Sequence, residues 1–264
     1  ETYDNAKLVL NNARKALPRE KLIWIAAAEL EEANGNIKMV RVIINKAISS
    51  LSARGVTLSR TEWLAEAKRC DVSGSVATCT AIIEETIGNG IDPVDYKSVW
   101  KEDAQQCIVR GHINTARAIY THAANHFKTK KSLWFDLAML EKKHGTREAM
   151  LAVLEKAVEF CPNADYLWVL AVKEEFMAGN LDAARNIIAR AYQTSPNSEQ
   201  IWLAAAKVEQ EDGKFADATA LLALARQKAP SGRVWMKSAV LQRQLKNDAE
   251  ELALLEEGTQ KYPD

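Results

Sequence analysis

Residues 196–213 read PNSEQIWLAAAKVEQEDG, and this order of residue types decides the fold because it returns along the whole chain. The tryptophan is followed by an alanine four residues later and by a glycine eleven residues later. Successive tryptophans of the sequence are 39, 37, 34, 34, 34 and 33 residues apart. A period of about 34 residues is the length of one helix-turn-helix unit, so the spacing predicts a repeat protein. The seven tryptophans are Trp24, Trp63, Trp100, Trp134, Trp168, Trp202 and Trp235.

The first helix of each predicted repeat carries the tryptophan. A small residue stands four positions later in six of the seven copies, with Val172 in the other, so a neighbouring helix can approach beside the indole. A glycine stands eleven positions later in six copies, with Lys246 in the seventh, and we expect it to end the helix in the left-handed conformation. These glycines are Gly35, Gly74, Gly111, Gly145, Gly179 and Gly213.

The second helix of each repeat carries two adjacent apolar residues, and in every copy but one, which has Thr86, a small residue follows three or four positions beyond them. Eight such helices and seven tryptophan helices predict an all-α fold of about fifteen helices, an α-α superhelix or solenoid. We expect one domain over residues 1–264, with half a repeat at 1–18 and tryptophan-bearing repeats from about 19 to 262. Because both ends interrupt the pattern, we expect a fragment of a longer array.

Two tryptophan intervals are longer than the others, and the excess lies between a second helix and the next first helix. The inserted segments, residues 50–61 and 88–98, are expected to form loops on one edge of the array. Ser59 and Glu62 have the spacing of a capping box for the helix that follows. Such loops either carry function or are insertions that a solenoid tolerates, and both interpretations remain open.

The composition narrows the classes of function. The 35 basic and 35 acidic residues cancel, which removes the strong global positive field of a dedicated nucleic-acid binder but allows local patches. No stretch is long and apolar enough for a membrane span, so we expect a soluble intracellular protein without membrane contact. The four cysteines lie too far apart for paired metal ligands, and we expect reduced, buried thiols.

No constellation of side chains predicts catalysis. His122 and His126 are four residues apart on a predicted helix, but no third ligand accompanies them, so we expect no metal site. A glutamate stands seven residues after the tryptophan in four repeats, and carboxylates one repeat apart converge on no substrate atom. These glutamates instead predict a recurrent polar contact between helices. We expect neither an enzyme nor a cofactor.

The densest basic region flanks the helix of Trp134. It is a candidate contact for phosphates or an acidic partner. The alternative is an ordinary set of solvated loop ends, since acidic residues intervene and no aromatic platform recurs. The candidate residues are Lys128, Lys130, Lys131, Lys142, Lys143 and Arg147.

The order tryptophan, alanine, glutamate and glycine resembles the half-a-TPR (HAT) repeat family, which is concentrated in RNA-processing proteins. The spacing covers the whole chain. Four longer phrases resemble the C-terminal repeat array of splicing factors within that family. These phrases are EEANGN (31–36), GSVATC (74–79), HGTRE (144–148) and PNSEQIWLAA (196–205).

This resemblance implies a nuclear scaffold of the spliceosome, a U5 snRNP component that bridges to the U4/U6 snRNP within the tri-snRNP. It implies partners that are mainly proteins of these particles, with RNA contact secondary, and neither catalytic residues nor a cofactor. Open repeat ends could also promote self-association. Two alternatives remain: a helical-repeat protein that binds single-stranded RNA directly, and a prenyltransferase α-type subunit, whose polar substrate-facing residues are largely replaced here.

Overall fold

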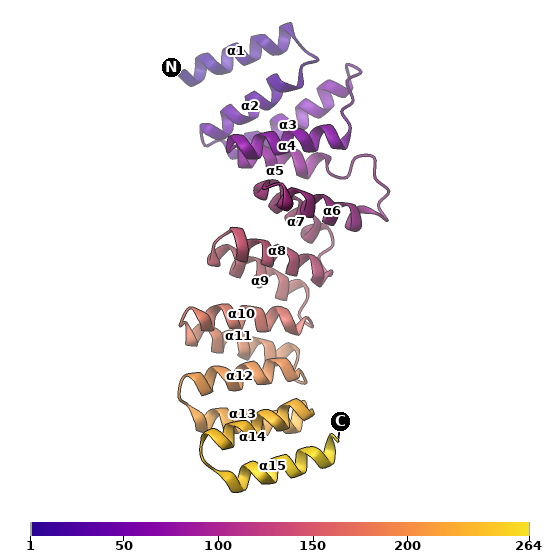
Figure 1. The fold of residues 1–264 in the computed structure, drawn as a ribbon. Helices are drawn as coiled ribbons and strands as arrows, with labels where there is room; N and C mark the ends of the chain where they lie inside the picture. Colours follow the sequence, from indigo (N-terminus) through magenta and orange to yellow (C-terminus); the bar gives the residue numbers. More distant parts are fainter. Residues whose placement is uncertain (1, 264) are drawn as a thin grey trace. The chain divides into compact units, whose positions relative to one another are not determined.

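The computed structural model describes residues 2–263, and these residues form fifteen α-helices and no strand (Figure 1). The all-α fold and the number of helices expected from the repeat pattern are confirmed. None of the described helices is long and apolar enough to cross a membrane. The helices are α1 (Thr2–Ala16), α2 (Lys21–Ala33), α3 (Ile37–Ser52), α4 (Arg60–Ser73), α5 (Val76–Thr86), α6 (Tyr96–Val109), α7 (Ile113–His126), α8 (Lys131–His144), α9 (Arg147–Phe160), α10 (Asp165–Met177), α11 (Leu181–Thr194), α12 (Glu199–Glu211), α13 (Phe215–Lys228), α14 (Gly232–Gln244) and α15 (Asp248–Lys261).

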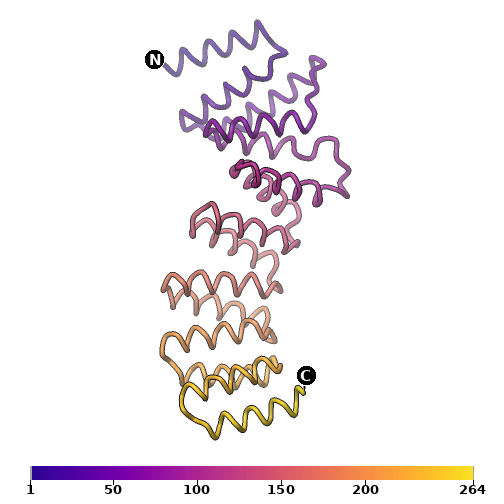
Figure 2. Tube along the Cα trace, viewed as in Figure 1, coloured from indigo at the N-terminus to yellow at the C-terminus, as the bar shows by residue number. Residues whose placement is uncertain are grey.

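The helices group into two compact units that meet in sequence between Phe127 and Lys128. The first unit contains α1 to α7, and the second contains α8 to α15. Within each unit a first helix, which bears the tryptophan, turns back into a second helix, as the Cα trace shows (Figure 2). The single continuous solenoid over residues 1–264 stays a prediction.

Burial of the tryptophans follows from the small residue one turn away. Six of the seven are buried, with Trp100 only 1% exposed, and every residue four positions later is buried as well. The small residue of the second helix is equally close: a Cβ at Gly258 would lie 3.1 Å from the Cβ of Trp235. Trp24 remains partly exposed because α1, which packs on its helix, buries none of its own residues.

The turns after the first helices use the left-handed conformation at five of the six predicted glycines. Gly145 is the exception, because its φ is −108° and α8 ends without a left-handed residue, so the expectation for that glycine was wrong. Thr146 caps the next helix there, because its hydroxyl accepts from the Ala149 N–H. Conversely, Lys246 adopts a positive φ of 59° at the position where the other repeats have glycine.

The two units stack their helices through different faces. In residues 2–127 the second helices α3, α5 and α7 contact one another, and the first helices α2 and α4 contact the second helix of the next repeat. Small buried side chains permit this approach: the Sγ of Cys79 in α5 lies 3.5 Å from the Oγ1 of Thr115 in α7. In residues 128–263 the first helices α10, α12 and α14 contact one another, and each second helix contacts the following first helix.

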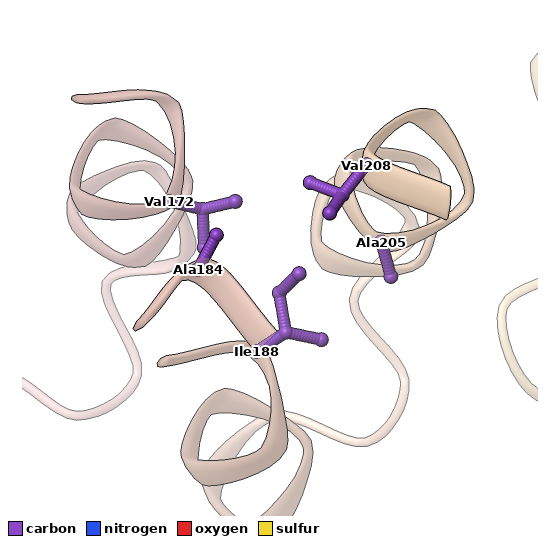
Figure 3. Close-up of a cluster of buried hydrophobic side chains, with 5 residues drawn as sticks. All are labelled: Val172, Ala184, Ile188, Ala205 and Val208. Carbon is purple, nitrogen blue, oxygen red and sulfur yellow. The ribbon is translucent and has the colours of Figure 1, made fainter. Parts of the chain in front are cut away.

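Aliphatic side chains from three consecutive helices form one of the core clusters of the second unit (Figure 3). Val172 comes from α10, Ala184 and Ile188 from α11, and Ala205 and Val208 from α12. Each of these side chains is at most 6% exposed. The core is therefore shared between adjacent repeats, as stacking requires, and no helix pair buries its apolar face alone.

The inserted segments are shorter than the sequence analysis expected. Helix α3 continues to Ser52 and α4 begins at Arg60, so residues 53–59 form the first connection. Helix α5 ends at Thr86 and α6 begins at Tyr96, so residues 87–95 form the second. The predicted capping box of Ser59 and Glu62 is confirmed, because each side chain bonds to the backbone N–H of the other residue.

Candidate functional site

The residue seven positions after the tryptophan fixes the turn that follows it. Its backbone carbonyl accepts the N–H of the residue five positions later in a Schellman arrangement, as in the 2.8 Å bond from Asn36 to Glu31. The Asn36 side chain also donates to the Glu31 carboxylate, at 2.8 Å. Side chains pair in the same way at Asn180 with Glu175, 2.8 Å, and at Asn247 with Gln242, 3.2 Å.

The same glutamates take a second partner from the preceding second helix. The Nζ of Lys7 lies 2.9 Å from Glu31, and the guanidinium of Arg185 lies 2.7 Å from Glu209. These donated hydrogen bonds hold the pKa of both carboxyls below their usual range. Arg147 pairs with Glu175 in the same manner. The predicted recurrent polar contact is thus confirmed, and its role is to join helices.

A different acidic residue links the repeats of the first unit. Glu32, one residue further along α2, accepts from the backbone N–H groups of Ala77 and Thr78 at the N-terminus of α5. Asp71 of α4 accepts from the N–H and hydroxyl of Thr115 at the N-terminus of α7. Each carboxylate therefore caps a helix of the next repeat and faces the positive end of its dipole. The sequence analysis missed these caps.

The indole N–H groups tie the tryptophans to the preceding connection. Those of Trp168 and Trp202 donate to the carbonyls of Pro162 and Pro196, each at 2.8 Å. The indole N–H of Trp235 is buried without a hydrogen-bond partner. The connection before it, residues 229–231, is one residue shorter than 195–198, so the turn lacks the carbonyl that the other repeats supply.

An open groove lies over α12 and α14 on the face where the first helices of the second unit meet. It holds about 700 Å³. Partly buried Leu203 and Val240 give it an apolar surface. Exposed Lys207, Arg233 and Lys237 outnumber the one acidic residue of the lining, Glu211. The groove can therefore accommodate a segment with apolar and acidic side chains. Spacing does not predict this groove, because most of its residues lie outside the repeated positions.

The basic residues around Trp134 do not form one patch. Lys128, Lys130 and Lys131 lie at the start of α8, whereas Lys142 and Lys143 lie at its end, about 20 Å away along a 14-residue helix. At the start, the Lys131 Nζ lies 5.7 Å from the Tyr166 ring centroid.

At the other end of α8, Lys142 pairs with Glu174 of α10, and Arg147 with Glu175. These two charges are therefore largely neutralised. A partner contact at the basic residues stays a prediction.

His122 and His126 pack within the first unit, as do three of the four cysteines, and the fourth, Cys161, directly follows α9. His122 and His126 make edge contacts with the Trp100 ring at 4.9 and 5.4 Å, and burial lowers the pKa of His122. No group of three potential metal ligands occurs within residues 2–263.

The expected buried thiols are found at all four cysteines. Burial raises the pKa of the Cys79 thiol to about 12 and that of Cys107 to about 11.

The two inserted connections lie side by side in the first unit. Thr57 to Ser59 of the first connection, the start of α4 up to Glu62, and Asn89 and Gly90 of the second connection line one open cavity of about 530 Å³. Their expected location on a common edge is therefore confirmed. The cavity is shallow, and Glu62 is already engaged in the capping box.

The sequence and fold are similar to known repeat proteins. A family model described as tetratricopeptide repeat matches residues 175–241, which lie within the second unit. Human pre-mRNA-processing factor 6 is 48% identical over 107 residues, covering 40% of this chain and 11% of that protein. Pre-mRNA-splicing factor prp1 of Schizosaccharomyces pombe is 42% identical over 130 residues, covering 49% of this chain and 14% of that protein.

Among solved structures, a thermophilic TPR protein of Thermus thermophilus matches with 17% identity and a TM-score of 0.43, covering 64% of this chain and 92% of that one. The resemblance to HAT-type repeats of splicing factors is confirmed over the matched part of the chain. The matches span 11% and 14% of the lengths of these two splicing-factor relatives, so this chain corresponds to a small part of each.

Proposed function

We propose that this chain is a protein-interaction scaffold that acts in pre-mRNA splicing. The observation that carries the proposal is the similarity to two proteins named as pre-mRNA processing or splicing factors. The tetratricopeptide match and the stacked first helices support it, because such arrays present extended surfaces to partners. A scaffold requires no catalytic residue, and we infer a nuclear protein that is not an enzyme.

In its finer form, the scaffold helps to bridge the U5 snRNP with the U4/U6 snRNP during tri-snRNP assembly. The groove over α12 and α14 is its candidate docking surface in the second unit. Lys207 and Lys237 are both exposed and line this groove, and neither forms an ion pair among the described residues. A partner segment with acidic side chains would pair with them while its apolar side chains cover Leu203 and Val240.

Affinity capture from nuclease-treated nuclear extract tests the scaffold. The tagged chain should recover defined U5 and U4/U6 proteins, and the double substitution Lys207→Glu and Lys237→Glu should reduce that recovery severalfold. A matched control, Lys156→Glu and Lys228→Glu, makes the same charge change at exposed lysines outside the groove. Recovery of RNA without these proteins would contradict the proposal. An equal loss of recovery in both double variants would show that the groove is not the docking surface.

A further inference from the structure

A second groove, in the first unit, is formed where α1 and α3 flank α2. Two open cavities of about 140 and 760 Å³ share Asn11 and Arg14 and together run along both outer helices. We call this surface the α1–α3 groove. Its residues of interest are Asn11, Arg14, Lys15, Trp24, Lys46 and Arg54.

Positive charge in this groove is not balanced by acidic side chains. Of the five basic residues in 33–61, a segment without an acidic residue, Lys46 and Arg54 line the groove, whereas Arg41 and Arg60 pair with Glu85 and Asp103. Within the part of the chain that the structure describes, Arg14, Lys15, Lys46 and Arg54 form no ion pair with a carboxylate. The one acidic residue of the lining, Glu31, already binds Lys7 at 2.9 Å.

The planar guanidinium of Arg14 lies beside the other basic side chains of the groove. The Arg14 guanidinium lies over the partly exposed Trp24 ring, 4.6 Å from its centroid, and also donates to the Asn11 side chain. The contact with the indole on one face and the in-plane hydrogen bond to Asn11 hold the guanidinium in place. A guanidinium held in this way is a platform on which a nucleobase stacks, and the Asn11 and Asn12 amides can bond base edges.

We propose that the α1–α3 groove binds single-stranded RNA. Its phosphates pair with Lys15, Lys46 and Arg54, while one unpaired base stacks on Arg14. Lys46 and Arg54 are eight residues apart on and just after α3, about 12 Å, which matches roughly three to four stacked nucleotides. An acidic peptide would pair with these basic side chains, but it has no base to stack on the Arg14 guanidinium. This site is separate from the protein scaffold, because its residues lie in the first unit and the docking groove lies in the second.

Fluorescence anisotropy with a labelled single-stranded RNA of about ten nucleotides tests this site on the intact chain. The double substitution Lys15→Gln and Arg54→Gln should weaken binding about tenfold or more and reduce the slope of log affinity against log salt by about 1.4. The control, Lys97→Gln and Arg110→Gln, makes the same charge change at exposed residues of α6 and its end, and should change affinity less than about twofold.

Arg14→Lys separates the platform from the charge. It keeps the positive charge but removes the planar group, so affinity should fall about fivefold or more with an unchanged salt slope. Circular dichroism checks that each variant remains folded. Equal effects of the two double variants, no effect of Arg14→Lys, or equally effective competition by polyglutamate would each overturn the proposal. Recovery of U5 proteins from nuclease-treated extract should be unchanged in Lys15→Gln and Arg54→Gln, which keeps this result distinct from a failure of the scaffold.

Discussion

Lys246 is the one non-glycine residue with a positive φ among residues 2–263, and it shows how strongly the repeat imposes its turn. Its N–H bonds to Arg243 and the following N–H to Gln242, as at the glycine turns. The left-handed conformation places the lysine Cβ close to the next carbonyl, which costs about 1–2 kcal/mol. The helices on both sides of the turn therefore hold the lysine in a conformation that is unfavourable for a residue with a Cβ.

Replacing this lysine by the glycine of the other repeats should stabilise the protein. We expect Lys246→Gly to raise the free energy of unfolding by about 0.5–1 kcal/mol, since relief of strain exceeds the entropy that glycine adds to the unfolded chain. Gly213→Ala is the reciprocal test: its φ is +76° and no atom would contact the new Cβ, so strain alone should cost about 1 kcal/mol. Urea denaturation measures both, and a change of the same sign in the two variants would contradict the argument.

Patterns within one helix or one turn could be predicted from the sequence, whereas contacts across repeats could not. The tryptophan, the alanine and most glycines were located correctly because each acts on neighbours within about one turn of helix. The exception, Gly145, has Glu141 packed against it: a Cβ there would lie 1.9 Å from the Glu141 Oε2. The uncovered face of Trp24 and the α1–α3 groove depend on how helices stack, which spacing does not encode.

At the scale of elements, the carboxylate caps of the first unit are contacts between repeats that spacing alone does not predict. An acid follows the seventh position after Trp24 and Trp63, and a threonine stands four residues after the turn glycine of the following repeat, Gly74 or Gly111. The capped residues lie 44 to 46 positions from their caps, so no local rule connects them. The caps accompany contact of a first helix with the next second helix, α2 with α5 and α4 with α7.

Removing one such cap should destabilise the first unit. Asp71→Asn replaces a charged acceptor of the Thr115 N–H, hydroxyl and Asn114 amide bonds by a neutral one, and should cost about 1–2 kcal/mol. Asp182→Asn is the matched control, because the Asp182 side chain is 98% exposed, and it should stay within about 0.5 kcal/mol. Chemical denaturation measures the free energy of unfolding of both variants. An equal loss in the two would show that the Asp71 cap does not stabilise the protein.

The contact between α11 and α12 predicts a dependence of stability on pH. Arg185 donates to Glu209 and holds the pKa of that carboxyl below its usual range. A lowered pKa in the folded state stabilises the protein above the ordinary value of about 4.3, and this contribution is lost as the pH falls through the folded value. Glu209→Gln should therefore cost about 1 kcal/mol at neutral pH and progressively less below about pH 4.

Urea denaturation at several pH values measures this difference. Glu159→Gln is the control, because Glu159 is exposed and forms no ion pair within residues 2–263, and its effect should not vary in the same way. A cost of Glu209→Gln that is constant from neutral to acid pH would show that the ion pair does not contribute.

At the scale of the whole molecule, the units differ in which helices contact one another. The tetratricopeptide match covers only residues 175–241, in the unit whose first helices contact one another. The first unit, which stacks through its second helices, carries the carboxylate caps instead. One sequence period thus supports two modes of stacking, and side chains outside the shared positions decide between them.

Because each repeat contacts only its neighbours, the loss of structure that follows a core substitution should be confined to nearby repeats. Trp168→Ala removes a buried indole of α10 and its bond to Pro162, and should cost about 3–5 kcal/mol, whereas the exposed Lys130→Ala should stay within about 0.5 kcal/mol. Cysteine labelling during mild denaturation locates the effect. Cys161, beside Pro162, should react much faster in Trp168→Ala, while Cys79 in the first unit should keep its rate. Equal melting temperatures of the two variants would refute the packing role of the tryptophan, and equal acceleration at Cys79 would refute its local reach.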